Sequence, residues 1–111
     1  MNEKLIWDFL YDKIKNPYGV AALMGNIYVE SGFNPKNLQR FYERKLNMSD
    51  EEYTKAVDNW AYTDFVYDSA GYGLAQWTYP SRKENLLMYA NKTNKSVGDL
   101  IMQLEFMWAE L

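Results

Sequence analysis

The sequence contains no cysteine and no histidine, and these two absences exclude several kinds of chemistry. Without cysteine, no disulfide bond can hold the fold together. Without histidine, no nucleophile can be activated by an imidazole base, and the usual zinc sites that contain histidine are impossible. Any catalytic chemistry must therefore come from carboxylates, amides, hydroxyls and the backbone.

The sequence also lacks a basic block and a long apolar run. Its 12 basic and 15 acidic residues give a net charge of −3, so the electrostatic footprint of a nucleic-acid-binding protein is missing. No apolar stretch approaches the length needed to span a bilayer, and the N-terminal segment MNEKLIWDFLYDK is too charged for a signal peptide. We therefore expect neither a nucleic-acid partner nor a membrane partner.

The composition that is present is typical of one globular domain. The chain has 111 residues, of which 48% are hydrophobic and 24% charged, so we expect a single domain over residues 1–111. Aromatic residues make up 17%, including four tryptophans and ten tyrosines. These rings fit either a tyrosine-rich core or a groove lined by amphipathic rings, which suits sugars.

Helical patterns dominate the first third of the chain. Residues 3–15 carry apolar side chains close to helical spacing. Asn16 followed by Pro17 is typical of an N-cap and a first helical residue, which predicts a second helix over about residues 17–31. That helix is apolar nearly all round, so we expect it to be the buried central helix, ended by Gly32 in a left-handed conformation.

The middle of the chain is more irregular. Residues 36–47 are polar and basic, and they predict a loop or a broken helix. Ser49 and Glu52 form a capping box that opens a short helix to about Asn59. The aromatic, glycine-containing segment that follows predicts a small hairpin with its turn near residues 68–71.

Two further helices are expected near the C-terminus. The first begins at a Ser81–Glu84 capping box or with Pro80 in its first turn, and it runs to about Asn91. Ser96 with Asp99 opens the last helix, whose expected buried face is Leu100, Ile101, Leu104, Met107 and Trp108. The predicted fold is mainly α, with about five helices around a buried central helix and one small β-hairpin.

The stretch GVAALMGNIYVESGFNP raises the question of why a segment built for burial ends in a carboxylate, Glu30. The C-terminal end of a helix carries partial negative charge, which disfavours an anion. Apolar neighbours such as Ile27 and Phe33 should exclude water, which also favours the neutral carboxyl. A protonated glutamic acid is what cleavage of a glycosidic bond requires, so Glu30 is the candidate general acid; the alternative is a surface glutamate at an ordinary helix end.

The same stretch, followed downstream by GYGLAQWT and SRKENLLMYA, resembles the bacteriophage tail lysozyme family. More distantly it is similar to soluble lytic transglycosylases and goose-type lysozymes. In those groups a Glu-Ser pair ends a buried helix, and a Gly-Leu-x-Gln segment lies across the cleft. Here the two motifs fall on Glu30-Ser31 and on Gly73 to Gln76. The closing QLEFMWAEL segment also matches the tail-lysozyme pattern, while residues 36–66 are the least familiar part.

The resemblance implies a lysozyme-like α+β fold with the hairpin beside the active-site cleft. It also implies cleavage of peptidoglycan at the β-1,4 bond after N-acetylmuramic acid, with Glu30 as general acid. Such chemistry needs no metal and no organic cofactor. The implied substrate-binding residues are Gln76 and the backbone around Leu74 and Ala75, which would hold the N-acetyl and carbonyl groups of the sugar. Further candidates are Ser31, Gly71 and Gly73, with Tyr72, Trp77 and Tyr79 as sugar-stacking rings. At least one of these three rings is expected in the core, Gly71 also serves a turn, and Ser31 is expected to act mainly in capping.

A second carboxylate is less clear from the sequence. Glycosidases usually use two carboxyl groups, although the N-acetyl group of the substrate can assist a single one. Asp64 and Asp68 precede the glycine pair, and either could position a water molecule as base. Asp68, within Asp-Ser-Ala-Gly, fits an ordinary turn residue equally well. The chemistry therefore stays open between hydrolysis and transglycosylation to a 1,6-anhydro end.

Two further alternatives remain, a non-catalytic glycan-binding module and a small helical interaction domain. The resemblance favours an enzyme whose partner is the bacterial glycan strand, acting in a virion tail or at the cell wall. We expect the isolated domain to be a monomer. Because the chain ends inside an apolar pattern without a C-cap, we also expect it to belong to a longer tail or lysin protein.

Overall fold

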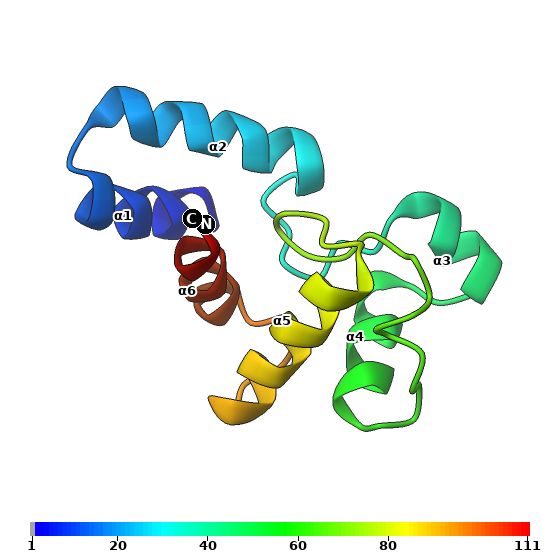
Figure 1. Ribbon diagram of the computed structural model, residues 1–111. Helices are drawn as coiled ribbons and strands as arrows, with labels where there is room; N and C mark the ends of the chain where they lie inside the picture. Colours follow the sequence, from blue (N-terminus) through cyan, green and yellow to red (C-terminus); the bar gives the residue numbers. More distant parts are fainter. Residues whose placement is uncertain (1) are drawn as a thin grey trace.

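The computed structural model describes residues 2–111, which form six helices joined by loops. Figure 1 shows α1 and α2 lying side by side, with α6 next to α1 and with α5 between this group and the pair α3 and α4. None of the helices in this described range is long and apolar enough to cross a membrane. The helices are α1 (Asn2–Ile14), α2 (Pro17–Ser31), α3 (Arg40–Leu46), α4 (Asp50–Asp58), α5 (Pro80–Lys92) and α6 (Leu100–Glu110).

The local signals that predicted the first helices are confirmed. The Asn16 side chain accepts hydrogen bonds from the backbone N–H groups of Tyr18 and Gly19, and Pro17 is the first residue of α2. Gly32 ends α2 with φ of 61°, a conformation that glycine adopts without steric cost. The capping box of Ser49 and Glu52 opens α4 as expected. These features depend on contacts within four residues, and the sequence therefore specifies them directly.

The prediction that α2 is the buried central helix is wrong. Only Val20, Ile27 and Ser31 are buried, whereas Tyr18 and Val29 are 85% and 83% exposed. The helix packs on α1 along one side, and no element covers its other side in the part of the chain described. The most buried helix is α6, and its buried face differs from the expected one: Ile101 is 42% exposed, and the buried residues are Met102, Gln103, Leu104, Phe106 and Met107.

The expected hairpin with a turn near residues 68–71 is also not present. Two isolated bridges take its place, Leu38 with Tyr72 and Tyr72 with Trp77. The turn lies later, where the Gln76 N–H donates to the Gly73 carbonyl at 3.1 Å. The four residues between Tyr72 and Trp77 form this turn, and the Tyr72–Trp77 pair closes it as a single bridge.

The structure shows which residues begin and cap the last two helices. Pro80 is the first residue of α5, and Tyr79 provides no side-chain cap, so the proline alternative is the right one. Asp99, and not Ser96, caps α6 by accepting the Met102 N–H. Within the segment predicted as a loop or broken helix, residues 40–46 form α3, which brings the helices of the described range to six.

A buried ion pair lies among aromatic rings beneath α5. The Lys83 side chain has no exposed surface, and its Nζ lies 2.6 Å from Asp68 Oδ1 and 4.2 Å from the centre of the Phe65 ring. Asp68 also accepts hydrogen bonds from the Tyr53 and Tyr62 hydroxyls at 2.6 and 2.7 Å. Burial lowers the pKa of Lys83 although Asp68 opposes this, and burial together with the bond to Asp68 raises the pKa of Tyr53. These groups join α4 and α5 through the loop between them.

A second group of polar contacts joins the start of α5 to the end of α6. Arg82 donates two hydrogen bonds to the Glu110 carboxylate, at 2.8 and 3.1 Å, and the Trp77 Nε1–H donates a third at 2.9 Å. Burial alone raises the pKa of Glu110, but the hydrogen bonds from Arg82 and Trp77 outweigh it, and the pKa lies below its ordinary value. Glu110 therefore stabilises the fold most in its charged form.

We expect the Glu110→Gln variant to be less stable than wild type by up to about 1 kcal/mol at neutral pH. A carboxyl whose pKa is lowered by folding contributes stability above its unfolded pKa, about 4.3, and loses that contribution as the pH falls through the folded pKa. Urea unfolding of both proteins from pH 7 to about pH 3 should show the difference shrinking on the acid side. A difference that stays constant over this range would contradict the assignment.

Candidate active site

The C-terminal half of α2, the turn at residues 73–76 and α6 together form a hollow of about 300 Å³. Its wall is mostly apolar, and Glu30 is the one carboxylate among the described residues that line it. Glu30 lies on the last turn of α2, and across the hollow lie Leu74 and Ala75. The two motifs that the sequence separates by more than forty residues thus meet at one place. The lining residues are Leu23, Asn26, Ile27, Glu30, Leu74, Ala75 and Met107.

The predicted shielding of Glu30 from solvent is wrong. Glu30 is an exposed residue, because α2 has one open side and Tyr28 and Val29 also face solvent. Its carboxyl is accessible from outside while its neighbours Leu23 and Ile27 line the same hollow. The Glu30 carboxyl is therefore exposed to solvent beside an apolar wall, and a ligand can reach both directly.

Gln103, a fully buried residue of α6, fixes the turn opposite Glu30. Its Oε1 accepts the Leu74 N–H at 2.9 Å, and its Nε2 donates to the carbonyls of Pro35 and Val97 at 2.7 and 2.8 Å. Gly73, with φ of 84°, lies so close that a Cβ there would be 2.9 Å from Gln103 Oε1. Gly73 is therefore required by the approach of Gln103, a neighbour within the protein.

The Ala75 N–H is the backbone donor that remains for a ligand. The neighbouring amides are engaged, because the Leu74 N–H donates to Gln103 of α6 and the Gln76 N–H donates to the Gly73 carbonyl within the turn. No described residue accepts a hydrogen bond from the Ala75 N–H. Ala75 also lines the hollow. An N–H group in this position can receive a carbonyl oxygen of a bound molecule, which is the role that the resemblance implies for the backbone here.

Gln76 and Ser31 bond within the protein. The Gln76 amide donates to the carbonyls of Asn37 and Gly73, both at 3.0 Å, and so braces the turn. The Ser31 hydroxyl donates to the Ile27 carbonyl at 3.0 Å, four residues earlier in α2, and does not serve as a cap for a following segment. Neither side chain lines the hollow. Both side chains hold the two sides of the site, and their contact with substrate stays a prediction.

Two of the three candidate stacking rings are core residues. Tyr72 and Trp77 have no exposed surface, and the Tyr72 hydroxyl is hydrogen-bonded to Thr54. Tyr79 is 71% exposed at the start of α5 but does not line the hollow. Gly71 is buried, and a Cβ there would be 2.8 Å from Gln76 Oε1. The sequence shows that rings gather here, but it does not show which of them face inward.

Neither aspartate proposed as a second carboxylate lines the hollow. Both oxygens of Asp68 are engaged, by Lys83 and the Ala70 N–H on one and by two tyrosine hydroxyls on the other. Asp68 is therefore a structural residue, and the turn interpretation was the better one. Asp64 is exposed, and its role as a base stays a prediction. Within residues 2–111 no three acidic side chains are placed to hold a metal ion.

Sequence reasoning missed two residues of this site. Asn26 lines the hollow one helical turn before Glu30, and its side chain has no hydrogen-bond partner in the described chain. The spacing of four residues, which places two side chains on the same helix face, could have revealed it. No local signal identifies Gln103, because its three partners lie in segments that only folding brings together.

We expect Gln103→Leu to destabilise the protein by about 2–3 kcal/mol, because it leaves a buried N–H and two carbonyls without partners. Urea unfolding measures the loss, and hydrogen exchange should become faster at the amides of residues 73–76. The matched control is Glu105→Gln, an exposed position two residues later in α6, with an expected effect below about 0.5 kcal/mol. Equal stability of the two variants would contradict the bracing role.

The comparisons with known proteins identify the family of the chain. No curated protein and no solved structure matches the chain. The model of the family described as phage tail lysozyme matches residues 1–111, the whole length. This confirms the resemblance drawn from the two motifs, and it indicates a lysozyme-like hydrolase of cell-wall glycan. The chain belongs to the phage tail lysozyme family.

Proposed function

We propose that this chain cleaves the β-1,4 bond between N-acetylmuramic acid and N-acetylglucosamine in bacterial peptidoglycan, with Glu30 as general acid. One observation carries the proposal: Glu30 is the single carboxylate among the described residues that line a hollow, and Leu74 and Ala75 of the second motif line it too, with the Ala75 N–H lacking a described partner. The partner is the glycan strand of the wall, and the place of action is a virion tail or the outside of a bacterial cell.

The apolar wall supports the role of Glu30 as an acid. A sugar ring placed over Ile27 and Met107 would displace water from the neighbouring carboxyl. Removal of water from a carboxyl favours its protonated form, and the negative end of the α2 helix acts in the same direction. The bound substrate thus provides the shielding that the free protein lacks, since Glu30 is exposed before binding.

The proposed reaction begins with transfer of the Glu30 proton to the glycosidic oxygen as the C1–O bond breaks. The acetamido oxygen of the same muramic acid attacks C1, which spreads the positive charge of the oxocarbenium-like transition state. In this proposal the Ala75 N–H and the Asn26 side chain, both from residues that line the hollow, hold the acetamido group in position. Glu30, now a carboxylate, then takes a proton from water as the water oxygen adds to C1, giving a reducing muramic acid end.

The absence of a second carboxylate from the described lining of the hollow supports a second candidate, lytic transglycosylation. In that reaction the 6-hydroxyl of the muramic acid attacks C1 in place of water, and Glu30 accepts its proton. The product is a 1,6-anhydro end. The first steps are the same, and the two reactions differ only in which oxygen reaches C1.

Mass spectrometry of fragments released from purified peptidoglycan tests both candidates. We expect soluble muropeptides with reducing muramic acid ends, while 1,6-anhydro ends would establish the transglycosylase. Cell walls from several bacteria should be tested, because the groups attached to the glycan strand differ between bacteria. If no wall releases fragments although the folded protein sediments with it, the chain is a glycan-binding module and the proposed cleavage is wrong.

A further inference from the structure

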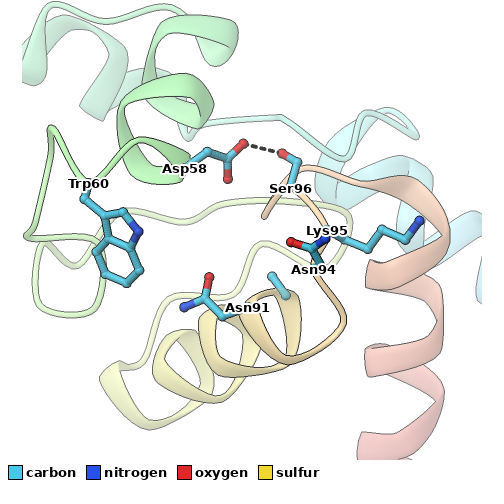
Figure 2. Close-up of a pocket in the computed structure, with 7 residues that line it drawn as sticks. Asp58, Trp60, Asn91, Asn94, Lys95 and Ser96 are labelled. Carbon is cyan, nitrogen blue, oxygen red and sulfur yellow. Dashed lines mark hydrogen bonds between the residues drawn. The ribbon is translucent and has the colours of Figure 1, made fainter.

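A second hollow, of about 560 Å³, lies between the end of α4 and the end of α5, and none of its lining residues lines the hollow at Glu30. Figure 2 shows Trp60 on one side of it, Asn91 projecting from α5 below, and Asn94 on the opposite side. Its volume is within the range of small-molecule sites in proteins. The family motifs and the proposed reaction do not involve these residues.

The wall of this hollow is held in place before any ligand binds. The Asp58 carboxylate, at the end of α4, accepts hydrogen bonds from the Ser96 hydroxyl and, at 2.9 Å, from the Val97 N–H (Figure 2). This joins α4 to the loop between α5 and α6. Because each Asp58 oxygen accepts a hydrogen bond from the loop between α5 and α6, the carboxylate holds the two segments together and shapes the site.

The groups that remain are an exposed ring and two amides. The Trp60 side chain is 62% exposed, and its backbone has φ of 61°, a left-handed conformation that bulky residues rarely adopt. The indole N–H of Trp60 and the side-chain amides of Asn91 and Asn94 have no hydrogen-bond partner among the described residues. The hollow therefore offers one flat apolar face and several donors and acceptors.

We propose that this hollow is a second glycan-binding site, which holds an uncharged hexosamine unit of the wall glycan against Trp60. A pyranose has an apolar face of C–H groups that packs on an indole ring, and its rim of hydroxyl and acetamido groups can bond to Asn91 and Asn94. Lys95 is the one cation among the described residues that line this hollow, and in Figure 2 its side chain extends away from Trp60. The site therefore favours the sugar over the acidic peptide stem.

The inference rests on the proposed function for the identity of its ligand. A strand engaged at two places would keep the enzyme on an insoluble wall between cleavage events, since the second contact becomes intramolecular. This would offset the lack of electrostatic attraction between an acidic protein and an anionic wall.

The test uses binding as well as activity, so that failure of the site can be distinguished from failure of the proposed reaction. In a Glu30→Gln background, sedimentation with purified peptidoglycan sacculi should show about tenfold weaker binding after Trp60→Ala or Asn91→Ala. Trp60→Phe should retain part of the affinity. The matched control is Tyr18→Ala, which removes a ring that is 85% exposed on α2 and should leave binding unchanged.

Activity gives an independent readout. With Glu30 intact, Trp60→Ala should slow the release of fragments from sacculi several-fold and leave cleavage of a short soluble glycan unchanged. Thermal unfolding checks that each variant is folded. Equal binding of the Trp60 and Asn91 variants and their parent would overturn the site, as would an equal loss after Tyr18→Ala. If wild type cleaves nothing, the reaction fails, while the binding series still decides this inference.

Discussion

Glu30→Gln is expected to reduce the release of muropeptides by about 10²- to 10⁴-fold, the usual contribution of a general acid. Glutamine has nearly the same shape but carries no proton that it can transfer to a glycosidic oxygen. Because Glu30 is exposed and makes no hydrogen bond or ion pair with the described residues, the substitution should leave the melting temperature and the binding of peptidoglycan nearly unchanged. The measurement is the initial rate of fragment release, quantified by mass spectrometry.

The matched control for this variant is Glu84→Gln, which makes the same chemical change at an exposed position of α5. We expect it to retain wild-type activity. Full activity in the Glu30→Gln protein would remove Glu30 from the chemistry and make Asp64 the next residue to replace. Loss of activity in both variants would point to an effect of surface charge on wall binding, which a salt titration of the rate would reveal.

Asp68→Asn is expected to destabilise the fold by about 3–5 kcal/mol, the usual result of removing one partner from a buried ion pair. It would leave the Lys83 ammonium, which has no exposed surface, without a carboxylate to balance its charge, beside the neutral Ala70 carbonyl and Tyr53 hydroxyl. For a domain of this size the melting temperature should fall by well over 10 °C, by about 4–8 °C for each kcal/mol. Urea unfolding followed by circular dichroism gives the free energy directly.

The chain provides an internal control for this comparison. Lys4 and Asp8 form an ion pair of similar length, 2.8 Å, but their side chains are 81% and 55% exposed. Asp8→Asn should therefore cost less than about 1 kcal/mol. The double variant Asp68→Asn with Lys83→Met should be more stable than the sum of the two single changes predicts, because it leaves no uncompensated buried charge. Strict additivity, or similar losses at Asp8 and Asp68, would show that burial does not control the strength of this pair.

The site was predictable where local patterns and the family resemblance coincide. Glu30 at the end of α2 and the Leu74-Ala75 backbone were predicted together, and the structure places them across one hollow. The prediction failed for side chains whose direction depends on distant neighbours. Tyr72 and Trp77 lie within three residues of Leu74 in the sequence. Their side chains nevertheless face the core, because α4 and α6 cover that side of the turn.

The buried residues Gln103 and Asp68 show why a single sequence could not identify the partners of a polar side chain. Gln103 contacts Leu74, Pro35 and Val97, which lie up to 68 residues away along the chain. The local Asp-Ser-Ala-Gly pattern left Asp68 open between a turn residue and a catalytic base, and its partner Lys83 lies 15 residues away. Nothing in the residues around a lysine in a helical pattern indicates that it is buried, and most lysines are exposed.

The sequence by itself determined where most helices begin and end, because caps, prolines and left-handed glycines act through hydrogen bonds within four residues of the chain. It also determined the family, through two short motifs and their spacing. Only the tertiary structure decided which faces are buried, that α6 rather than α2 is the most enclosed helix, and that Asp68 pairs with Lys83. Burial and ion pairing depend on which surfaces pack together in the folded chain, and no local sequence pattern specifies those contacts.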